Sequence, residues 1–253
     1  MQNIDTAPNE AILPTFTCVY ASEKIAFFLS RHRMKFISAF ILTLVFLPFA
    51  FAQNEQAPIV EKDVAYKNWT YKDVRSGQNV NLRDFTLGKK LVVVVYFAPW
   101  CPNWRHDAPM LESLYEKYHS KGLDIIAVGE YDPVASMQTN LSDLKITFPA
   151  VYESENRTEK QNTLHYSYRK STGDNRNWGS PWYIFLSPDA IEKKGDTLVN
   201  KSFVINGEMI QGEGEKFIRE KLGLPADTKG AIAKKSETEV CETDKTTVVL
   251  KKP

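Results

Sequence analysis

Leu91-Val92-Val93-Val94-Val95-Tyr96-Phe97 is an unbroken run of β-branched and aromatic residues, and Ala98-Pro99-Trp100-Cys101-Pro102-Asn103-Trp104-Arg105 follows it directly. An uninterrupted apolar run of this length is typical of a strand that is covered on both faces. Proline is favoured in the first turn of a helix, so Pro102 is compatible with a helix that begins just after Cys101. The sequence therefore predicts a buried strand that leads into a helix, with a thiol at the turn.

Cys101 lies at the predicted amino terminus of that helix. The free backbone amides and the helix dipole at such a position favour negative charge, and therefore a nucleophilic thiolate. The alternative is that this cysteine is simply a small buried hydrophobic residue. The position favours the first reading, and we expect Cys101 to be exposed and reactive.

Strand and helix patterns alternate on both sides of this region. Before it, two short alternating runs flank a turn cluster and predict a hairpin. After it, strands and helices follow one another, which implies parallel strands joined by crossover helices. The expected elements are a hairpin of residues 69–74 and 80–85, helices over 104–119, 133–144, 158–170 and 213–222, strands over 123–128, 148–152 and 182–186, and a hairpin of 202–205 with 208–210 across Asn206-Gly207. We therefore expect an α/β fold with a mixed central sheet, helices on its faces and an N-terminal β-hairpin extension.

Residues 34–52 have the pattern of a secretory signal peptide, with a charged start, an apolar middle and Ala50-Phe51-Ala52 at the end. The apolar run is shorter than the roughly 20 residues that a membrane-spanning helix needs, so membrane contact is expected only through this transient segment. Because signal peptides begin at the initiator, Met34 is the more natural start, and residues 1–33 are expected to be an upstream extension outside the native protein. The mature protein is expected to be periplasmic or secreted.

Charge and cysteine content narrow the function classes. The chain of 253 residues has 32 Lys and Arg against 31 Asp and Glu, and this balance does not favour a nucleic-acid partner. Residues 58–223 are expected to form one domain, followed by a flexible polar tail over 224–253. After cleavage, Cys101 and Cys241 remain, which are too few for a disulfide framework, so each needs its own explanation.

The region around Cys101 resembles the thioredoxin-like thiol-disulfide oxidoreductases of the TlpA and ResA type, in the AhpC/TSA and redoxin superfamily. Their pattern is Trp-Cys-x-x-Cys-Arg-x-Glu-x-Pro-x-Leu. It is matched at Trp100, Cys101, Arg105, Pro109 and Leu111, approximately matched at Asp107, and broken at Trp104, where the second cysteine would stand. The resemblance covers about residues 58–223, and it implies a thioredoxin fold and thiol-disulfide exchange.

A second family mark is Gly179-Ser180-Pro181, which precedes the predicted strand over residues 182–186. The resemblance implies that Pro181 follows a cis peptide bond and faces Cys101, and that the backbone of Ser180 pairs with an extended substrate. An X-Pro bond tolerates the cis form at a cost of about 0.5 to 1 kcal/mol. The alternative is a trans proline that merely starts the strand.

The departures from the pattern affect the expected mechanism. Trp104 cannot act as a resolving thiol, so a mixed disulfide at Cys101 would persist or would need an external thiol reductant. Cys241 is a possible distal resolving thiol, since the entropy of loop closure grows only slowly with length; alternatively it is a tail cysteine without a role. The resemblance implies that Asp107 moves protons near the sulfur, although a lone acid on a helix face is often only solvated.

Four tryptophans flank the two loops and suggest an aromatic rim for an apolar peptide or ligand, although core packing would explain some of them. They are Trp100, Trp104, Trp178 and Trp182. The expected substrate-binding residues are Trp100, Pro102, Trp104, Ser180, Pro181 and Trp182.

The leading hypothesis is a monothiol oxidoreductase that acts on protein, peptide or small-molecule disulfides through Cys101 and Asp107, with no cofactor and no metal. The rival is a non-catalytic thioredoxin-fold module that binds clients or peptides. A peroxiredoxin-like peroxidase is disfavoured, because Pro-x-x-x-Thr-x-x-Cys counted from Pro99 places Asn103 and His106 at the last two positions. A copper chaperone would need two cysteines and a histidine, and Cys101 with His106, His119 or His165 gives no recognisable spacing.

Overall fold

The computed structural model describes residues 55–225. The predicted upstream extension, the signal peptide, Cys241 and nearly all of the predicted tail lie outside these residues. Within them, no helix is long and apolar enough to cross a membrane.

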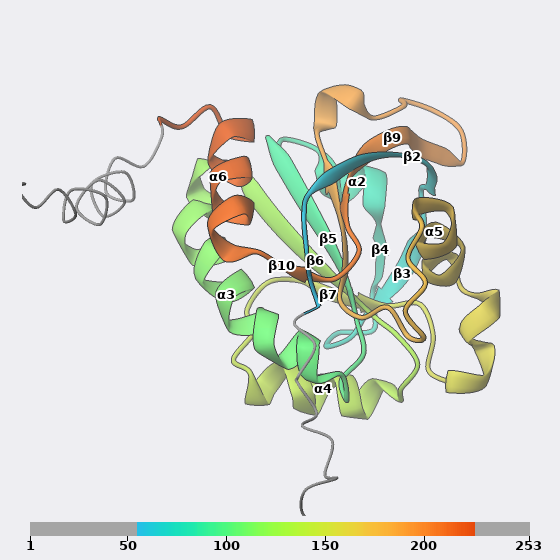
Figure 1. Ribbon diagram of the computed structural model, residues 1–253. Coiled ribbons are helices and arrows are strands. Elements are labelled where there is room, and N and C mark those ends of the chain that lie inside the picture. Colours follow the sequence, from blue (N-terminus) through green and yellow to red (C-terminus); the bar gives the residue numbers. More distant parts are fainter. Residues whose placement is uncertain (1–54, 226–253) are drawn as a thin grey trace, which may run out of the picture. The chain divides into compact units, whose positions relative to one another are not determined.

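The described residues form one mixed eight-stranded sheet (Figure 1). Its centre is β5 (Leu91–Phe97), which runs parallel to β6 (Leu123–Gly129) and antiparallel to β8 (Trp182–Leu186). These three strands are buried along their whole length, as expected from the apolar residues that dominate them. In spatial order the strands are β2 (Val60–Lys67), β9 (Thr197–Ile205), β8, β5, β6, β7 (Ala150–Tyr152), β3 (Thr70–Asp73) and β4 (Asn79–Asn81).

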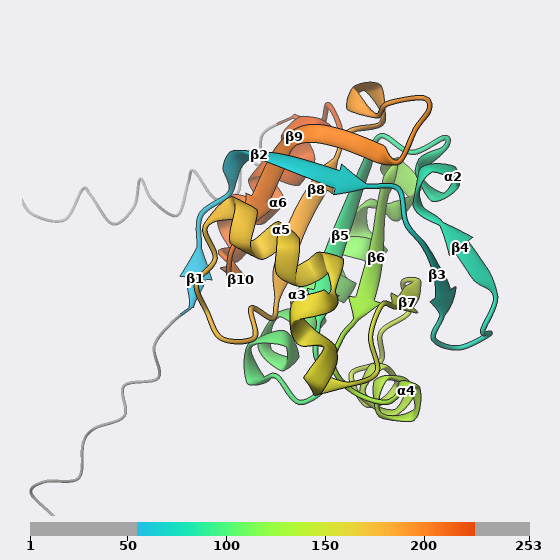
Figure 2. The ribbon, with the colours of Figure 1, turned by 90° about the vertical axis from the view of Figure 1, so that its right-hand side faces the viewer.

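The sheet has a core on each face, because successive residues of a strand point to opposite sides. Val93, Val95 and Phe97 of β5 pack with α3, α4 and α6, whereas Val94 and Tyr96 pack on the other face with α5. Figure 1 shows α3 and α6 on one side of the sheet and α5 on the other, and Figure 2 shows α5 in front of it. The helices are α2 (Leu82–Thr86), α3 (Pro102–Tyr118), α4 (Val134–Asp143), α5 (Leu164–Thr172) and α6 (Gln211–Lys221).

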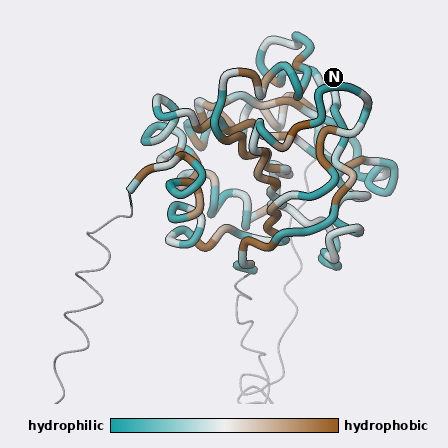
Figure 3. Tube along the Cα trace, turned by 90° about the horizontal axis from the view of Figure 1, so that it is seen from above, coloured by the Kyte–Doolittle hydropathy of each residue, from teal (hydrophilic) through white to brown (hydrophobic). Residues whose placement is uncertain are grey.

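Hydropathy follows this layering. The most hydrophobic segments run through the centre of the described chain, and hydrophilic segments surround them (Figure 3). The α/β fold with a mixed sheet and flanking helices, expected from the sequence, is confirmed.

The amino-terminal region differs from its prediction in detail. Strands β3 and β4 pair antiparallel on either side of the predicted turn. The second strand is much shorter than expected, since the chain turns at Asn81 into α2, where the Asn81 side chain accepts a hydrogen bond from the amide of Asp84 at 3.2 Å. This is an ordinary N-cap, which ends the strand. Strand β2, which the sequence analysis did not predict, pairs with β9 at the other edge of the sheet.

The hairpin predicted across Asn206-Gly207 does not form. Strand β10 (Glu208–Met209) pairs in parallel with β1 (Gln56–Ala57) instead of with β9. A β-carbon on Gly207 would lie 2.1 Å from the carbonyl oxygen of Glu55, so glycine allows the two backbones to approach. The predicted helix over 158–170 is also divided, into the 3₁₀ turn Arg157–Asn162 and α5, which begins after the N-cap Thr163.

Candidate active site

Cys101 is the residue immediately before α3, at the carboxyl end of β5. Its amide donates to the carbonyl of Ala98 at 2.9 Å, and its own carbonyl accepts from the amide of Arg105 at 3.2 Å. The predicted strand, turn and helix start are therefore confirmed. The residue is only 7% exposed, however, so the expectation of an exposed thiol is wrong.

The loop before β8 covers the thiol. Cys101 Sγ donates to the carbonyl oxygen of Ser180 at 3.1 Å, and the Ser180–Pro181 peptide bond is cis. The Ser180 hydroxyl accepts a hydrogen bond from the amide of Ala98 at 3.0 Å, which ties this loop to the end of β5. The two sequence marks that lie far apart in the chain thus meet at the sulfur, as expected.

Trp104 is fully buried and cannot belong to a surface rim. Its indole ring packs on Phe97 with ring centroids 4.6 Å apart, and its Nε1 donates to Asn140 Oδ1 at 2.8 Å. The amide group of Asn140 in turn donates to the carbonyl of Pro99 at 3.1 Å. The residue that replaces the second cysteine therefore acts as a core residue, and its predicted contact with substrate is wrong.

Trp182 is also fully buried, because it lies in the central strand β8, and its Nε1 donates to Asn206 Oδ1 at 2.8 Å. The aromatic surface is therefore smaller than expected. It consists of Trp100 and Trp178, which are half-buried and have ring centroids 5.2 Å apart. Pro102 is exposed.

Cationic side chains cover the two half-buried indoles. The guanidinium of Arg157 lies 4.5 Å from the Trp100 ring, and the ammonium of Lys160 lies 4.5 Å from the Trp178 ring. Beside Trp100 there is an open cavity of about 420 Å³, whose lining includes Pro99, Trp100, Arg105, Asp132, Asn140 and Asp143. Sequence reasoning missed this cavity, since α4 supplies one of its walls.

The loop that carries Ser180 and Pro181 is built around a buried cation. Arg169, on α5, is fully buried, and its Nε lies 3.0 Å from Asp174 Oδ2. Its guanidinium also donates to the carbonyl of Trp178 at 2.6 Å and to the carbonyl of Arg176. Gly179 has a φ of +61°, and a β-carbon there would lie 1.7 Å from Arg169 Nε. Only a residue without a side chain therefore fits between this loop and the guanidinium.

Asp107 is buried on the second turn of α3, so the reading as a solvated acid is wrong. Its Oδ2 accepts from the hydroxyl of Tyr183 at 2.5 Å and from the amide of Met209 at 2.8 Å. Burial raises the pKa of Asp107 above its usual value, and these two donors oppose part of the rise.

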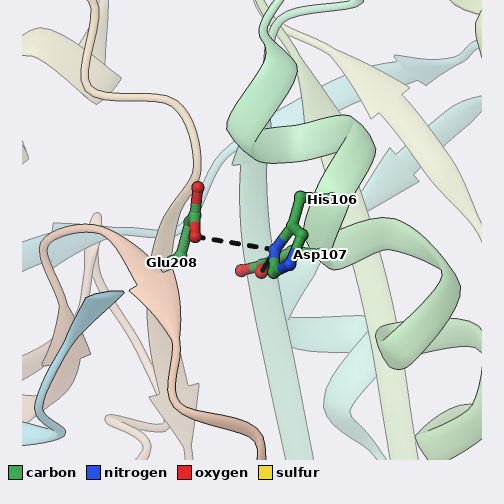
Figure 4. A group of neighbouring side chains, drawn as sticks. All are labelled: His106, Asp107 and Glu208. Atoms are coloured by element: carbon green, nitrogen blue, oxygen red, sulfur yellow. Dashed lines mark hydrogen bonds and ion pairs between the residues drawn. The ribbon is translucent and has the colours of Figure 1, made fainter. Parts of the chain in front are cut away.

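Two further side chains face Asp107. His106 Nδ1 is 3.2 Å from Asp107 Oδ1 and 3.5 Å from Glu208 Oε2 (Figure 4). Glu208, at the start of β10, was not singled out from the sequence. No local pattern marks it, because the β1–β10 pairing brings it to α3 from the far end of the chain.

Residues 62–172 match the model of the AhpC/TSA family. The chain is also 29% identical over 86 residues to the thiol-disulfide oxidoreductase ResA of Halalkalibacterium halodurans, an alignment that covers 34% of this chain and 47% of ResA. The chain thus spans about half the length of this curated relative.

Solved structures with low similarity include two thiol-disulfide proteins. One is a thiol:disulfide interchange protein, DsbE, from Chlorobium tepidum, with a TM-score of 0.45, 19% identity, and 65% of this chain and 99% of that chain covered. The other is a secreted disulfide oxidoreductase of Mycobacterium tuberculosis, with a TM-score of 0.41, 18% identity, and coverage of 62% and 95%.

The raised pKa of Asp107 predicts how the stability of this protein depends on pH. A buried acid with a raised pKa holds its proton more tightly in the folded state, so its stabilising contribution is complete below the unfolded pKa of about 3.9 and is lost as the pH rises through the folded value. Asp107→Asn keeps an oxygen for Tyr183 and Met209 but has no proton to lose. We therefore expect this variant to become more stable relative to the wild type as the pH rises from about 4 toward neutral.

Urea unfolding at several pH values between about 4 and about 8 measures this difference. Asp143→Asn, which removes an exposed carboxylate at the end of α4, is the matched control and is expected to follow the wild type. If the Asp107→Asn curve stays parallel to the wild-type curve over the whole range, the proton is not held at Asp107.

Proposed function

We propose that this protein carries out thiol-disulfide exchange, with Cys101 as a single-thiol nucleophile on protein or small-molecule disulfides. The observation that carries the proposal is the contact of Cys101 Sγ with the Ser180 carbonyl, beside cis Pro181 and at the start of α3. This arrangement places the thiol at a helix amino terminus, next to a backbone segment that can pair with an extended substrate. The name of the ResA relative, a thiol-disulfide oxidoreductase, supports the same chemistry.

The proposed reaction needs an external thiol because residue 104 supplies none. The Cys101 thiolate attacks one sulfur of the client disulfide, which breaks the client S–S bond, forms a Cys101–client disulfide and releases the other client sulfur as a thiolate that takes up a proton. One external thiol then attacks the Cys101 sulfur and frees the client as a dithiol, and a second external thiol releases Cys101. In the net reaction the client disulfide is reduced to two thiols, and two external thiols are oxidised to one disulfide.

Roles for the neighbouring residues follow from their positions. Trp100 and the exposed Pro102 are the proposed surface contacts for the client, and the Ser180–Pro181 backbone is the proposed pairing segment. Asp107 is proposed to hold and release protons inside the domain. Cys241 is the proposed alternative to the external thiol. The proposed location of the protein is periplasmic or extracellular.

Adduct formation tests the proposal. The chain beginning at Gln53, with Cys241→Ala to leave one thiol, is incubated with a peptide disulfide and analysed by intact-mass spectrometry. We expect a peptide adduct at Cys101 that disappears when glutathione is added, and no adduct in Cys101→Ser. A chain that forms no adduct under conditions where free cysteine does so would contradict the proposal.

The second candidate is the non-catalytic client-binding module. The burial of Trp104 and the low exposure of Cys101 favour it, because both reduce the capacity for turnover. Binding of the reduced peptide to Cys101→Ser, measured by calorimetry, separates the two functions. The module is supported if Cys101→Ser binds the peptide as tightly as the parent chain does and Cys101 of the parent chain forms no adduct. The enzyme requires both adduct formation and turnover with the external thiol.

A further inference from the structure

Three side chains from two distant segments place possible metal ligands at one point (Figure 4). His106 and Asp107 are neighbours on α3, and Glu208 begins β10. One nitrogen of the histidine and one oxygen of each carboxylate all lie within 4.8 Å of one another.

The separations of these atoms fit a common ion. Zinc binds imidazole nitrogen at about 2.0–2.1 Å and carboxylate oxygen at about 2.0–2.2 Å, so two ligands at a tetrahedral angle lie about 3.3–3.6 Å apart. His106 Nδ1 is 3.2 Å from Asp107 Oδ1 and 3.5 Å from Glu208 Oε2. Two of the three separations therefore match a zinc site, and the carboxylate oxygens of Asp107 and Glu208, which lie within 4.8 Å of each other, would adjust to complete it.

In metal sites, hydrogen bonds from neighbouring residues orient the carboxylates that bind the ion. Asp107 is oriented in the same way. Its Oδ2 accepts from Tyr183 and from the amide of Met209, which leaves Oδ1 facing His106. Met209 directly follows Glu208, so the same short strand supplies both an orienting donor and the third ligand. The site is thus supported from α3, β8 and β10.

The local charge also favours a cation. Asp107 is 1% exposed and Glu208 is 8% exposed, so two carboxylates lie close together with little water. The His106 side chain is 66% exposed, which gives an ion a route from solvent.

We propose that His106, Asp107 and Glu208 form a binding site for one divalent zinc ion, with water in the fourth position. One imidazole nitrogen and two carboxylate oxygens suit zinc, whereas calcium and magnesium prefer sites made of oxygen alone. The proposal does not depend on the redox chemistry of Cys101. The sequence analysis predicted no metal site, because only the fold brings Glu208 next to His106 and Asp107.

Calorimetric titration with zinc chloride tests the site. The protein is the tag-free chain from Gln53 with Cys101→Ser and Cys241→Ala, because thiolates and histidine tags bind zinc themselves. We expect one zinc ion per chain, and at least a tenfold loss of affinity in His106→Gln and in Glu208→Gln. Tyr183→Phe, which removes an orienting donor from Asp107, is expected to weaken binding by about tenfold.

His119→Gln is the matched control, because His119 Nδ1 lies 3.9 Å from one carboxylate, Asp124, and this histidine is not in the proposed site. It is expected to leave zinc affinity unchanged. Thermal unfolding in EDTA checks that each variant is folded, and the visible spectrum of bound Co²⁺ reports the coordination. Absence of binding, or equal affinity in His106→Gln and the parent chain, would overturn the site, as would an equal loss in His119→Gln.

Discussion

Trp104→Cys, which restores the Cys-x-x-Cys spacing, is expected to lower the free energy of unfolding by about 3–5 kcal/mol rather than to produce an efficient dithiol enzyme. The substitution removes a fully buried indole that packs on Phe97. It also leaves the buried Asn140 Oδ1 without the donor that Trp104 provides at 2.8 Å. A cavity and an unpaired polar atom are both costly inside a core.

The same change is expected to disturb the loop before Cys101. Asn140 connects Trp104 to the carbonyl of Pro99, so loss of the indole releases one contact that positions this loop. Urea unfolding measures the stability of Trp104→Cys under reducing conditions. Trp104→Phe is the control, since it keeps most of the packing and is expected to cost less.

Two other results would assign a different role to Trp104. If Trp104→Cys were as stable as the wild type and formed an internal disulfide with Cys101, the scaffold would retain a working dithiol site. The role of Trp104 as a core residue would then be wrong. If instead Trp104→Phe were as damaging as Trp104→Cys, the hydrogen bond to Asn140 would matter more than the volume of the ring.

The sequence predicts those parts of the site that depend on local sequence patterns. The apolar run of β5, the proline after Cys101 and the Gly179-Ser180-Pro181 mark each lie within a few residues, and their structural counterparts are present. The solvent exposure of a side chain could not be predicted from such local patterns. Whether Cys101, Trp104 and Trp182 reach the surface depends on the elements that cover them, and all three are buried.

The residues that sequence reasoning missed depend on distant pairing. Glu208 reaches Asp107 because β10 pairs with β1 instead of β9, whereas Asn206-Gly207 suggested a local hairpin. Arg169 carries no motif of its own. Its role depends on the loop of residues 174–179, which folds around its guanidinium.

Arg169→Met is expected to lower the free energy of unfolding by about 3–5 kcal/mol, the typical cost of breaking a buried ion pair. Arg169 is fully buried. Without it, Asp174 and the carbonyl of Trp178 each lose one hydrogen-bond donor. Urea unfolding measures this cost. Because the loop continues into Ser180 and Pro181, the rate at which Cys101 forms a peptide adduct is expected to change as well.

Arg176→Met is the matched control for this effect. Arg176 also pairs with Asp174, at 2.8 Å, but its side chain is 19% exposed while that of Arg169 is fully buried. Solvent can replace part of what Arg176 provides, so this variant is expected to lose less stability than Arg169→Met. If the order were reversed, or if Arg169→Met stayed within about 1 kcal/mol of the wild type, the loop would be held by contacts other than the buried guanidinium. If the order holds and Arg169→Met also changes the rate of adduct formation, the geometry at Cys101 depends on a cation that lies on the face of the sheet opposite to α3.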